Sequence, residues 1–381
     1  MDYEINENII RIRLDGRIDS NNHNEIYERI KEILDNNSFS DLVLDFKDVN
    51  YISSAGLRVM LKIKKEFGSL SIVNVSIDVY EIFDMTGFTQ LIEIKKASRF
   101  VSVKGAKVIG DGYYSTVYKI DSDTIIKVFN RTSDDQQIER ELRRAKDAFV
   151  SGIPTAISFD IVEVEDGKKG VQFELIDARP LRDCFRDDRD KYDFWLEKYV
   201  ELLKTINTTE CCDHEVTDMK DFYIEKVEYI KDNLGQDYEK VLSLVKGIKD
   251  SNTFVHGDCH FKNILVQGEE LLLIDMDTLS KGNPIFELTA LRFAYLVFNE
   301  LEKGNSEIFF EMKEEFCAKL YDDIIEKYYS NINQIDKDKI AMLSYIQMAW
   351  WNRVENAGEE KLEKCLKNIN NLLSRVNDLN I

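Results

Sequence analysis

The stretch from Phe254 to Asp277, which reads FVHGDCHFKNILVQGEELLLIDMD, constrains the rest of the chain more than any other segment. Its apolar start leads into a polar loop in which Asp258 and Asn263 lie five residues apart, and an apolar run typical of a buried strand then ends at Asp275. One carboxylate that accepts a hydroxyl proton, together with an Asn and an Asp that bind Mg2+, is the arrangement that phosphoryl transfer uses. A plain loop followed by an exposed acidic hairpin is the alternative, but the combined spacing favours phosphoryl transfer.

The size and the charge of the chain argue against several classes of protein. At 381 residues, two or three domains are expected. The 51 basic against 71 acidic side chains argue against a nonspecific nucleic-acid surface or an anionic-membrane surface. No apolar run approaches the roughly 20 residues that span a bilayer, and the first residues lack the basic flank and apolar core of a secretory signal. We therefore expect a cytoplasmic protein that binds neither nucleic acid nor a membrane.

The six cysteines are scattered along the chain without a regular spacing. In a chain of this length, that distribution indicates reduced thiols of the cytosol. The segment 211–214, Cys-Cys-Asp-His, is a local cluster, but no second half of a ligand set occurs elsewhere in the sequence. We therefore do not expect a metal site there.

Residues 1–98 form the first predicted domain. Ile9, Arg11 and Arg13 alternate with Ile10, Ile12 and Leu14, which predicts a strand of period two, and Asp15-Gly16 predicts a turn. Strands that alternate with helices predict an open α/β sheet. Further helices are expected at 23–36, from Leu57 onward and at 77–85, and further strands at 41–46, 70–75 and 91–94.

Four segments in this domain resemble a STAS domain, the module of anti-sigma-factor antagonists in bacterial partner-switching systems. They are L-D-G-R-I-D-S at 14–20, the strand end D-F-K-D-V at 45–49, Y-I-S-S-A-G-L at 51–57 and F-D-M-T-G-F at 83–88, and the resemblance covers nearly all of residues 3–97. It implies a protein partner, which would be an anti-sigma factor or a kinase.

The same resemblance marks Ser54 as a candidate phosphorylation site. Ser54 aligns with the serine that a partner kinase modifies in the family, whereas Ser53 stands where the family often has Asp. A phosphate at a helix N-terminus is electrostatically tolerated, and it would add about two negative charges to the surface. The alternative is that Ser54 serves only as the N-cap of the following helix.

A glycine pair lies near the start of the second predicted domain, residues 99–381. Gly110 and Gly112 flank Asp111 between two strand-like segments, where glycines bend the chain and free backbone N–H groups for phosphate oxygens. Because Val117 and Tyr118 continue as a strand and not as a helix, a dinucleotide-binding fold is disfavoured. A hairpin loop over the phosphates of a nucleotide is the better interpretation.

Lys127 is embedded in the short apolar strand 124–129, where a lysine needs a partner or a ligand. The charged helix 134–150 offers Glu139 and Glu141 as partners, and Glu141 is preferred because apolar residues of the helix share the face beside it. In kinases such a lysine holds the nucleotide phosphates. An edge-strand lysine that points to water is the alternative.

The remaining pattern predicts two lobes of unequal size. A β-hairpin is expected over 157–176, and its second strand would be the hinge whose backbone binds an adenine edge. From Leu181 onward the periodicity is mostly helical. A β-rich small lobe at about 101–180 therefore precedes a helical large lobe at about 181–381, with helices expected at 192–207, 219–231, 235–250, 285–303, 305–330 and 336–378.

These segments, in this order, resemble the aminoglycoside phosphotransferase and choline kinase group, which has the protein-kinase-like fold. The motifs that carry the resemblance include H-G-D-x-H-F-K-N at 256–263 and I-D-M-D at 274–277. The resemblance implies that Asp258 is the catalytic base. It further implies that Mg2+ is bound by Asn263 and Asp275, and that the phosphates of ATP are held with the help of Gly110, Gly112, Lys127 and Glu141.

Other residues of the loop receive secondary roles from the same resemblance. His256 is expected to support the loop, and His260 either supports the loop or joins the site. Asp277 either assists the metal or binds a cationic substrate.

The expectation is thus an α/β STAS domain followed by an α+β bilobal protein-kinase-like domain, which transfers the γ-phosphoryl group of ATP to a hydroxyl of a small molecule of the aminoglycoside, choline or sugar-like class. Met276-Asp277 follows Asp275 where protein kinases have Phe-Gly, and this favours a small acceptor over a protein. The acidic charge of the chain would suit a cationic acceptor, or it serves only solubility. The alternative function is a signalling protein whose kinase-like domain senses nucleotide or phosphorylates a serine of a STAS domain.

Overall fold

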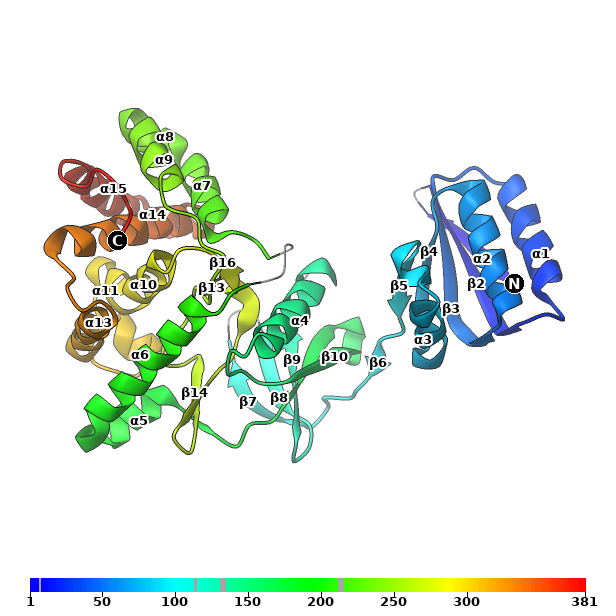
Figure 1. The fold of residues 1–381 in the computed structure, drawn as a ribbon, viewed down its shortest axis with the longest axis horizontal. Helices are drawn as coiled ribbons and strands as arrows, with labels where there is room; N and C mark the ends of the chain where they lie inside the picture. Colours follow the sequence, from blue (N-terminus) through cyan, green and yellow to red (C-terminus); the bar gives the residue numbers. More distant parts are fainter. Residues whose placement is uncertain (7, 113–114, 131–134, 212–215) are drawn as a thin grey trace. The chain divides into compact units, whose positions relative to one another are not determined.

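The computed structural model describes residues 1–381 except 7, 113–114, 131–134 and 212–215 (Figure 1). Most of the Cys-Cys-Asp-His segment at 211–214 therefore lies outside the described residues. The chain divides into two compact units, Met1–Ser102 and Val103–Ile381. In the described parts of the chain, no helix is both long enough and apolar enough to cross a membrane.

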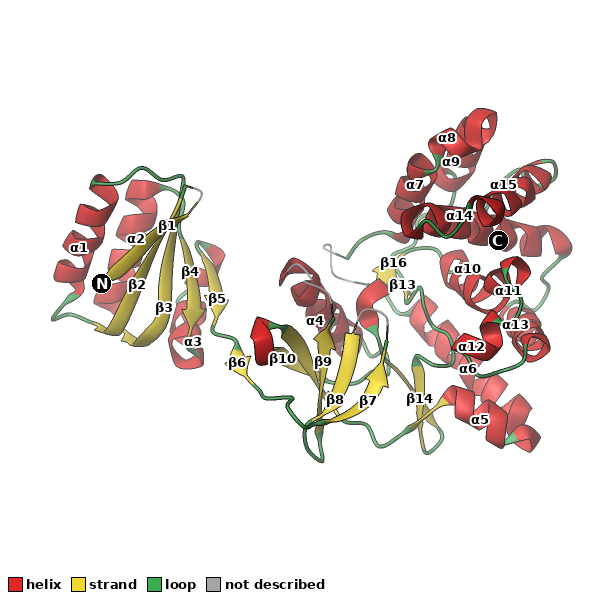
Figure 2. Cartoon of the chain, turned by 180° about the vertical axis from the view of Figure 1, so that it is seen from behind, coloured by secondary structure: helices red, strands yellow, loops and turns green. Residues whose placement is uncertain are grey.

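The first unit is built on a five-stranded sheet with the order β1-β2-β3-β4-β5 (Figure 2). Its core includes the apolar side chains that alternate along β2 and are buried, which are Ile10, Ile12, Leu14 and, beyond Gly16, Ile18. Strand β1 is antiparallel to β2, and the remaining neighbours are parallel. The elements are β1 (Asp2–Asn6), β2 (Ile9–Ile18), α1 (His23–Asp35), β3 (Asp41–Ile52), α2 (Ser54–Phe67), β4 (Ser71–Val75), α3 (Ile77–Met85) and β5 (Glu93–Lys96).

Two local expectations for this unit were wrong. Asp15-Gly16 does not form a turn, because β2 continues through it to Ile18. The register between β2 and β3 shifts beside it, and the φ of +68° at Gly16 accommodates this irregularity. The strand expected at 91–94 is β5, which starts at Glu93 because the residues before it form a short 3-10 turn, Phe88–Gln90.

The N-terminus of α2 separates the two serines. Ser53 is the N-cap, and its Oγ accepts hydrogen bonds from the backbone N–H of Ala55 (3.2 Å) and of Gly56 (3.4 Å). Ser54 is the first helical residue and is exposed. The alternative that Ser54 is only a cap is therefore wrong, because Ser53 has that role.

The second unit begins with a strand-rich lobe whose strands lie in the order β10-β11-β9-β8-β7, all antiparallel (Figure 1). Helix α4 contacts β10 and β11. The sequence left open whether Lys127 lies on an edge strand. It does not, because β9 is a central strand in which Lys127 pairs with Val117 on one side and with Val171 on the other. The elements are β7 (Lys107–Asp111), β8 (Ser115–Lys119), β9 (Thr124–Phe129), α4 (Asp135–Val150), β10 (Ser158–Glu163) and β11 (Lys169–Glu174), and β6 (Arg99–Phe100) precedes them.

The rest of the second unit is mainly helical. Three of the helices predicted from the sequence are interrupted there. The stretch 336–378 forms two helices, because the chain adopts positive φ at Asn356 (+51°) and at Gly358 (+114°). The stretch 305–330 breaks near Glu311, which also has positive φ (+56°), and 285–303 contains a π-helical turn, Phe293–Val297. The helices are α5 (Leu181–Asp187), α6 (Tyr192–Thr208), α7 (Met219–Tyr229), α8 (Lys231–Leu234), α9 (Tyr238–Lys246), α10 (Ile285–Arg292), α11 (Phe298–Leu301), α12 (Asn305–Phe309), α13 (Glu314–Tyr328), α14 (Gln334–Glu355) and α15 (Glu359–Leu373).

Four short strands hold the polar loop of the opening motif in place. The loop lies between β13 (Phe254–Val255) and β14 (Ile264–Gln267), and β14 pairs with β15 (Glu270–Leu273). Strand β13 pairs with β16 (Ser280–Lys281). Apolar residues on both sides of the loop are fully buried in the large core of this unit, so the loop is anchored at both of its ends.

Candidate active site

His256 fixes the start of the polar loop from inside the protein. It is fully buried, and its Nδ1 accepts a hydrogen bond from the backbone N–H of Asp258 (3.3 Å), while its Nε2 lies 3.3 Å from the carbonyl oxygen of Ile274. Since Nδ1 accepts, Nε2 carries the proton and donates it to that carbonyl. Burial lowers the pKa of His256, which keeps the ring neutral. The ring thus ties the loop to the chain just before Asp275.

Glu287 of α10 supports the same loop, and the sequence reasoning missed it. Its carboxylate accepts the backbone N–H of His256 (2.6 Å) and of Gly257 (3.2 Å), and its side chain is fully buried. Burial raises the pKa of Glu287 to about 7, while the two N–H donors oppose this shift. A lone carboxylate among the mostly apolar residues of the helix IFELTALR was the available signal in the sequence.

Gly257 is required by the shape of the loop. Its φ of +77° lies in the left-handed region, and an added Cβ would lie 3.0 Å from the Cε of Met219. Both the backbone conformation and the neighbouring helix α7 therefore disfavour a side chain here.

Asp258 and Asn263 form a hydrogen-bonded pair across the loop. The Nδ2 of Asn263 donates to the backbone oxygen and to the Oδ2 of Asp258, each at 3.0 Å. The Asp258 side chain remains 44% exposed, so a ligand can reach it. Burial of its surroundings raises the pKa of Asp258 to about 7, and the nearby charge of Asp275 acts in the same direction. Since water still reaches the carboxylate, it screens part of this effect in the open site.

His260 and Lys262 both contact the segment around Phe309. His260 is 5% exposed, its Nε2 lies 3.5 Å from Asp258 Oδ1, and burial lowers its pKa to about 4. Its ring packs edge-on against Phe309 and Phe310. Lys262 donates to the carbonyl oxygen of Phe309 (2.9 Å) and lies over its ring. A neutral His260 therefore packs behind Asp258 and helps to fix its position.

Lys127 binds three carboxylates. Its Nζ lies 2.6 Å from Glu141 Oε1, 2.8 Å from Asp275 Oδ1 and 3.6 Å from Asp277 Oδ2. Lys127 is 7% exposed and Glu141 is 1% exposed. Burial by itself would lower the pKa of Lys127, but Asp275 and Glu141 together raise it above its usual value. Lys127 therefore stays charged and links α4 of the strand-rich lobe to the segment after β15.

Glu141 and Asp275 respond differently to this arrangement. Burial raises the pKa of Glu141, and the neighbouring Asp277 adds to the rise. For Asp275, burial also acts upward, but the charge of Lys127 outweighs it and lowers the pKa. Asp275 has a φ of +67°, which is unusual for a residue other than glycine and which ends β15 with a sharp change of direction.

Asn263 and Asp275 are brought together by the β14–β15 hairpin. The backbone N–H of Ile274 donates to the carbonyl oxygen of Asn263 (3.0 Å), so the residue before Asp275 is bonded to Asn263. Separately, carboxylate oxygens of Glu141, Asp275 and Asp277 lie within 4.8 Å of one another. Amide and carboxylate oxygens are the ligands that Mg2+ prefers. Because Lys127 already lies among the three carboxylates, the partly exposed Asp275 is the member best able to share its charge with an ion.

The glycine pair differs in part from its expected role. Gly110 lies within β7, and the backbone N–H of Gly112 donates to the carbonyl oxygen of Ser115 (2.9 Å). That N–H is thus already bonded in this conformation of the hairpin. Tyr113 and Tyr114 lie outside the described residues.

A pocket of about 390 Å³ adjoins the loop, and sequence reasoning did not locate it. Gly257, Asp277, Thr278 and Ser280 line part of it, and α4, α7, α10 and α14 supply the remaining lining. Aromatic side chains are prominent there, among them Tyr223 and Trp350. The elements that form it are far apart in the sequence, so no local pattern could have revealed it.

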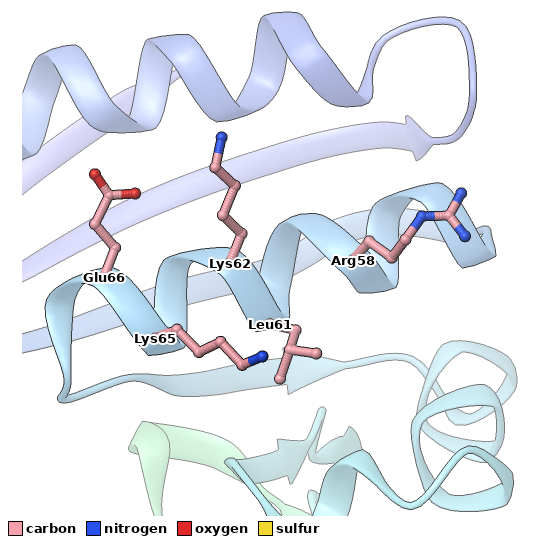
Figure 3. A pocket seen from close by; sticks show the side chains of 5 residues that line it. All are labelled: Arg58, Leu61, Lys62, Lys65 and Glu66. Carbon is pink, nitrogen blue, oxygen red and sulfur yellow. The ribbon is translucent and has the colours of Figure 1, made fainter.

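The first unit presents a different kind of surface along α2. Arg58, Leu61, Lys62, Lys65 and Glu66 line a shallow depression there, and Figure 3 shows their side chains extending from the helix. Three of these five side chains are cationic. This basic surface follows Ser54 along the same helix.

Comparisons with known proteins match the two units separately. Residues 1–100 match the family model of the STAS domain, and residues 105–307 match the model of the phosphotransferase enzyme family, APH. The anti-sigma-B factor antagonist of Bacillus subtilis (strain 168) is 32% identical over 102 residues, which are 26% of this chain and 92% of that protein.

Similar solved structures cover the second unit. An apo crystal structure of a thermostable mutant of aminoglycoside phosphotransferase APH(4)-Ia has 13% identity and a TM-score of 0.48, over 71% of this chain and 94% of that chain. A choline/ethanolamine kinase family protein from Mesorhizobium loti has 12% identity and a TM-score of 0.46, over 71% of this chain and 92% of that chain.

Proposed function

We propose a function from the premise that this chain belongs to the APH phosphotransferase enzyme family and carries an N-terminal STAS domain. In this proposal, the chain is an ATP-dependent kinase that phosphorylates a hydroxyl group of a small molecule. The proposal rests on two neighbouring groups of side chains. In the first, Lys127 forms ion pairs with Glu141 and Asp275, and in the second, Asn263 donates a hydrogen bond to Asp258. A lysine for phosphates and a carboxylate for a hydroxyl are the two protein groups that phosphoryl transfer needs.

Asp258 acts as the catalytic base in this proposal. It accepts the proton of the acceptor hydroxyl as that oxygen forms its bond to the γ-phosphorus, while the bond from the γ-phosphorus to the bridging oxygen of ADP breaks. The hydrogen bond from Asn263 and the neutral His260 behind it hold the carboxylate in one orientation. An elevated pKa makes Asp258 a stronger base than an ordinary aspartate.

Lys127 binds the phosphates of ATP, and Glu141 orients it. The ion pair fixes the Nζ at the floor of the strand-rich lobe. Gly110 and Gly112 complete the nucleotide site, since the absence of side chains there lets the β7–β8 hairpin approach a phosphate.

Asn263 and Asp275 are the residues that would bind Mg2+. The fit is favourable, because the Nδ2 of Asn263 is used by Asp258 and its amide oxygen remains for a cation, and because Asp275 uses Oδ1 for Lys127 and keeps Oδ2. When bound, Mg2+ neutralises the charge of the phosphate oxygens.

The two domains divide the work. We assign residues 1–98 to partner binding by the STAS domain, and 99–381 to phosphoryl transfer, with a small lobe at about 101–180 and a large lobe at about 181–381. The partner of the STAS domain would be an anti-sigma factor or a kinase, and the chain would act in the cytoplasm.

ADP formation by the full chain tests this proposal. The chain is incubated with ATP and Mg2+ and a panel of hydroxylated amines, sugars, aminoglycosides and hydroxy acids, beside the variants Asp258→Asn and Asp190→Asn. Asp190 is an exposed aspartate of the turn Arg189–Lys191 and serves as the matched control. Acceptor-dependent ADP formation that is lost only in Asp258→Asn supports the proposal. Failure to bind a non-hydrolysable ATP analogue, together with no turnover, would contradict it.

A second function is favoured by one observation, the exposed Ser54 beside the capping Ser53. In this alternative, the kinase-like domain phosphorylates a serine of a STAS domain, on the same chain or on another. Mass spectrometry of the full chain after incubation with ATP distinguishes the two functions. Phosphate on Ser54 that is absent from Asp258→Asn, with no small-molecule turnover, would select the signalling function.

A further inference from the structure

The pocket beside Gly257 contains a lysine, Lys226, that packs against two aromatic rings. The Nζ of Lys226 lies 4.3 Å from the ring centre of Tyr223 and 5.2 Å from that of Trp350. Among the described residues, no carboxylate forms an ion pair with it. Burial lowers the pKa of Lys226 to about 8, since water is removed from the ammonium group and no counter-ion replaces it. The two aromatic rings offset only part of this cost.

Arg144 brings a second cation to the same pocket. Its Nη1 donates to the backbone carbonyl oxygen of Asp277, and it has no ion pair with a carboxylate in the described part of the chain. A guanidinium has five N–H donors, so most of them remain for another acceptor. Burial, together with the nearby Arg140, lowers the pKa of Arg144, although the charges of Asp277 and Glu141 act in the opposite direction.

Gln347 adds a neutral hydrogen-bond donor to the pocket. The hydroxyl of Tyr223 donates to the Oε1 of Gln347 (2.6 Å), and this bond leaves the amide NH2 of Gln347 for other acceptors. The pocket therefore combines an amide donor with two cations.

The acidic groups of the pocket are poorly placed to bind a polycation. Asp277 lies 3.6 Å from Lys127, so part of its charge is already compensated. Glu225 is exposed, where water screens its charge. A ligand with several ammonium groups would instead meet Lys226 and Arg144.

We propose that the acceptor is a hydroxylated small molecule that carries an anionic group, a carboxylate or a phosphate, and a flat apolar part. The anionic group binds Lys226 and Arg144, and the apolar part packs against Trp350. In this proposal the hydroxyl reaches Asp258, which follows the pocket-lining Gly257 in the chain. This assignment rests on the proposed function, and it replaces the cationic acceptor class with an anionic one.

Binding of four matched probes to the full chain tests the assignment. The probes are para-hydroxymethyl benzoate, the corresponding phenylphosphonate, the neutral amide and the benzylamine, titrated by calorimetry with Mg2+ and a non-hydrolysable ATP analogue present. The variants are Lys226→Met and, as a matched control, Lys231→Met. Lys231 lies over the ring of Tyr238 (4.8 Å) and is not part of the pocket.

We expect one or both anionic probes to bind more tightly than the amide and the amine. Lys226→Met should raise the Kd of the anionic probes roughly 10- to 100-fold and leave that of the amide unchanged, as a lost charge-assisted hydrogen bond predicts. Lys231→Met should change neither. The stronger of the two anionic probes identifies the carboxylate or the phosphate class.

Two results would overturn the assignment: tighter binding of the amine with no effect of Lys226→Met, or no binding of any of the four probes. ADP formation is measured in parallel to separate this outcome from the proposed function. Asp258-dependent phosphorylation of an amine would refute the anionic acceptor but retain the kinase. Anion binding that depends on Lys226, without ATP turnover on any acceptor, would refute the kinase but retain the anion site.

Discussion

Replacing Lys127 should destabilise the second unit more than replacing its closest partner, Glu141. Lys127→Met removes the ammonium group that contacts all three carboxylates, whose oxygens lie within 4.8 Å of one another. Glu141→Gln removes one carboxylate charge but leaves Lys127 bonded to Asp275 (2.8 Å). The two substitutions therefore differ in the charge that they leave unpaired.

The size of the difference follows from the distances. Two carboxylates at that separation repel each other by about 3.5 kcal/mol at an effective dielectric constant of about 20. Asp275 and Asp277 are 41% and 32% exposed, so water reduces their share of the repulsion. We therefore expect Lys127→Met to cost about 3–5 kcal/mol, as for a broken buried ion pair, and Glu141→Gln to cost about 1–2 kcal/mol.

The loss should depend on pH in one direction. Burial raises the pKa of Glu141, and removal of Lys127 raises it further. A carboxyl group whose pKa is higher in the folded state than in the unfolded state lowers the free energy of unfolding only where it is ionised. This loss is small at low pH and grows as the pH rises toward that raised pKa. The deficit of Lys127→Met relative to the parent should therefore shrink as the pH falls through the raised pKa of Glu141.

Tryptophan fluorescence during urea unfolding measures this loss in the second unit alone. The three tryptophans, Trp195, Trp350 and Trp351, all lie in that unit, so the first unit is silent. The free energy of unfolding is compared for the parent and both variants at each pH. Equal losses for the two variants, or a Lys127→Met deficit that grows toward acid, would refute the electrostatic reasoning.

Three further predictions concern the loop and the first unit. If Asp258 is the base, turnover falls as the pH drops below its pKa of about 7, and pH–rate profiles should show Asp258→Asn reducing kcat by roughly 10²–10⁴-fold. Gly257→Ala should cost about 1–3 kcal/mol in the same unfolding assay because of its positive φ and its contact with Met219, and it should exceed the cost of Gly268→Ala, which has a similar φ and open space around it. Ser53→Ala should cost about 1 kcal/mol and speed amide exchange at the start of α2, whereas Ser54→Ala should not.

The order of motifs along the chain was sufficient to predict the fold class. The α/β STAS domain and the α+β bilobal protein-kinase-like domain are both confirmed. Local patterns were enough for this prediction. For example, the alternation of apolar and polar residues around Ile10 and Ile12 predicts a half-buried strand, and both isoleucines are buried. Errors occurred where φ changes sign at one residue, as at Gly16 and Asn356, because periodicity continues across such a point.

The candidate site was only partly visible in the sequence. Lys127, Asp258 and Asp275 stand out because each is polar within or beside an apolar strand. Glu287 and Lys226 do not, because each acts through a contact made with a distant part of the chain. Their importance depends on how helices pack around the loop, and a single sequence does not encode that packing as a local pattern.

The division of labour between Ser53 and Ser54 has a consequence for any signal that the first unit carries. Ser53 alone completes the hydrogen bonds at the start of α2, and the hydroxyl of Ser54 takes no part in them. A change in the chemistry of Ser54 can therefore alter the surface that a partner meets, next to the basic side chains of α2, without unwinding the helix. The residue open to modification, Ser54, and the residue that caps the helix, Ser53, are therefore different side chains.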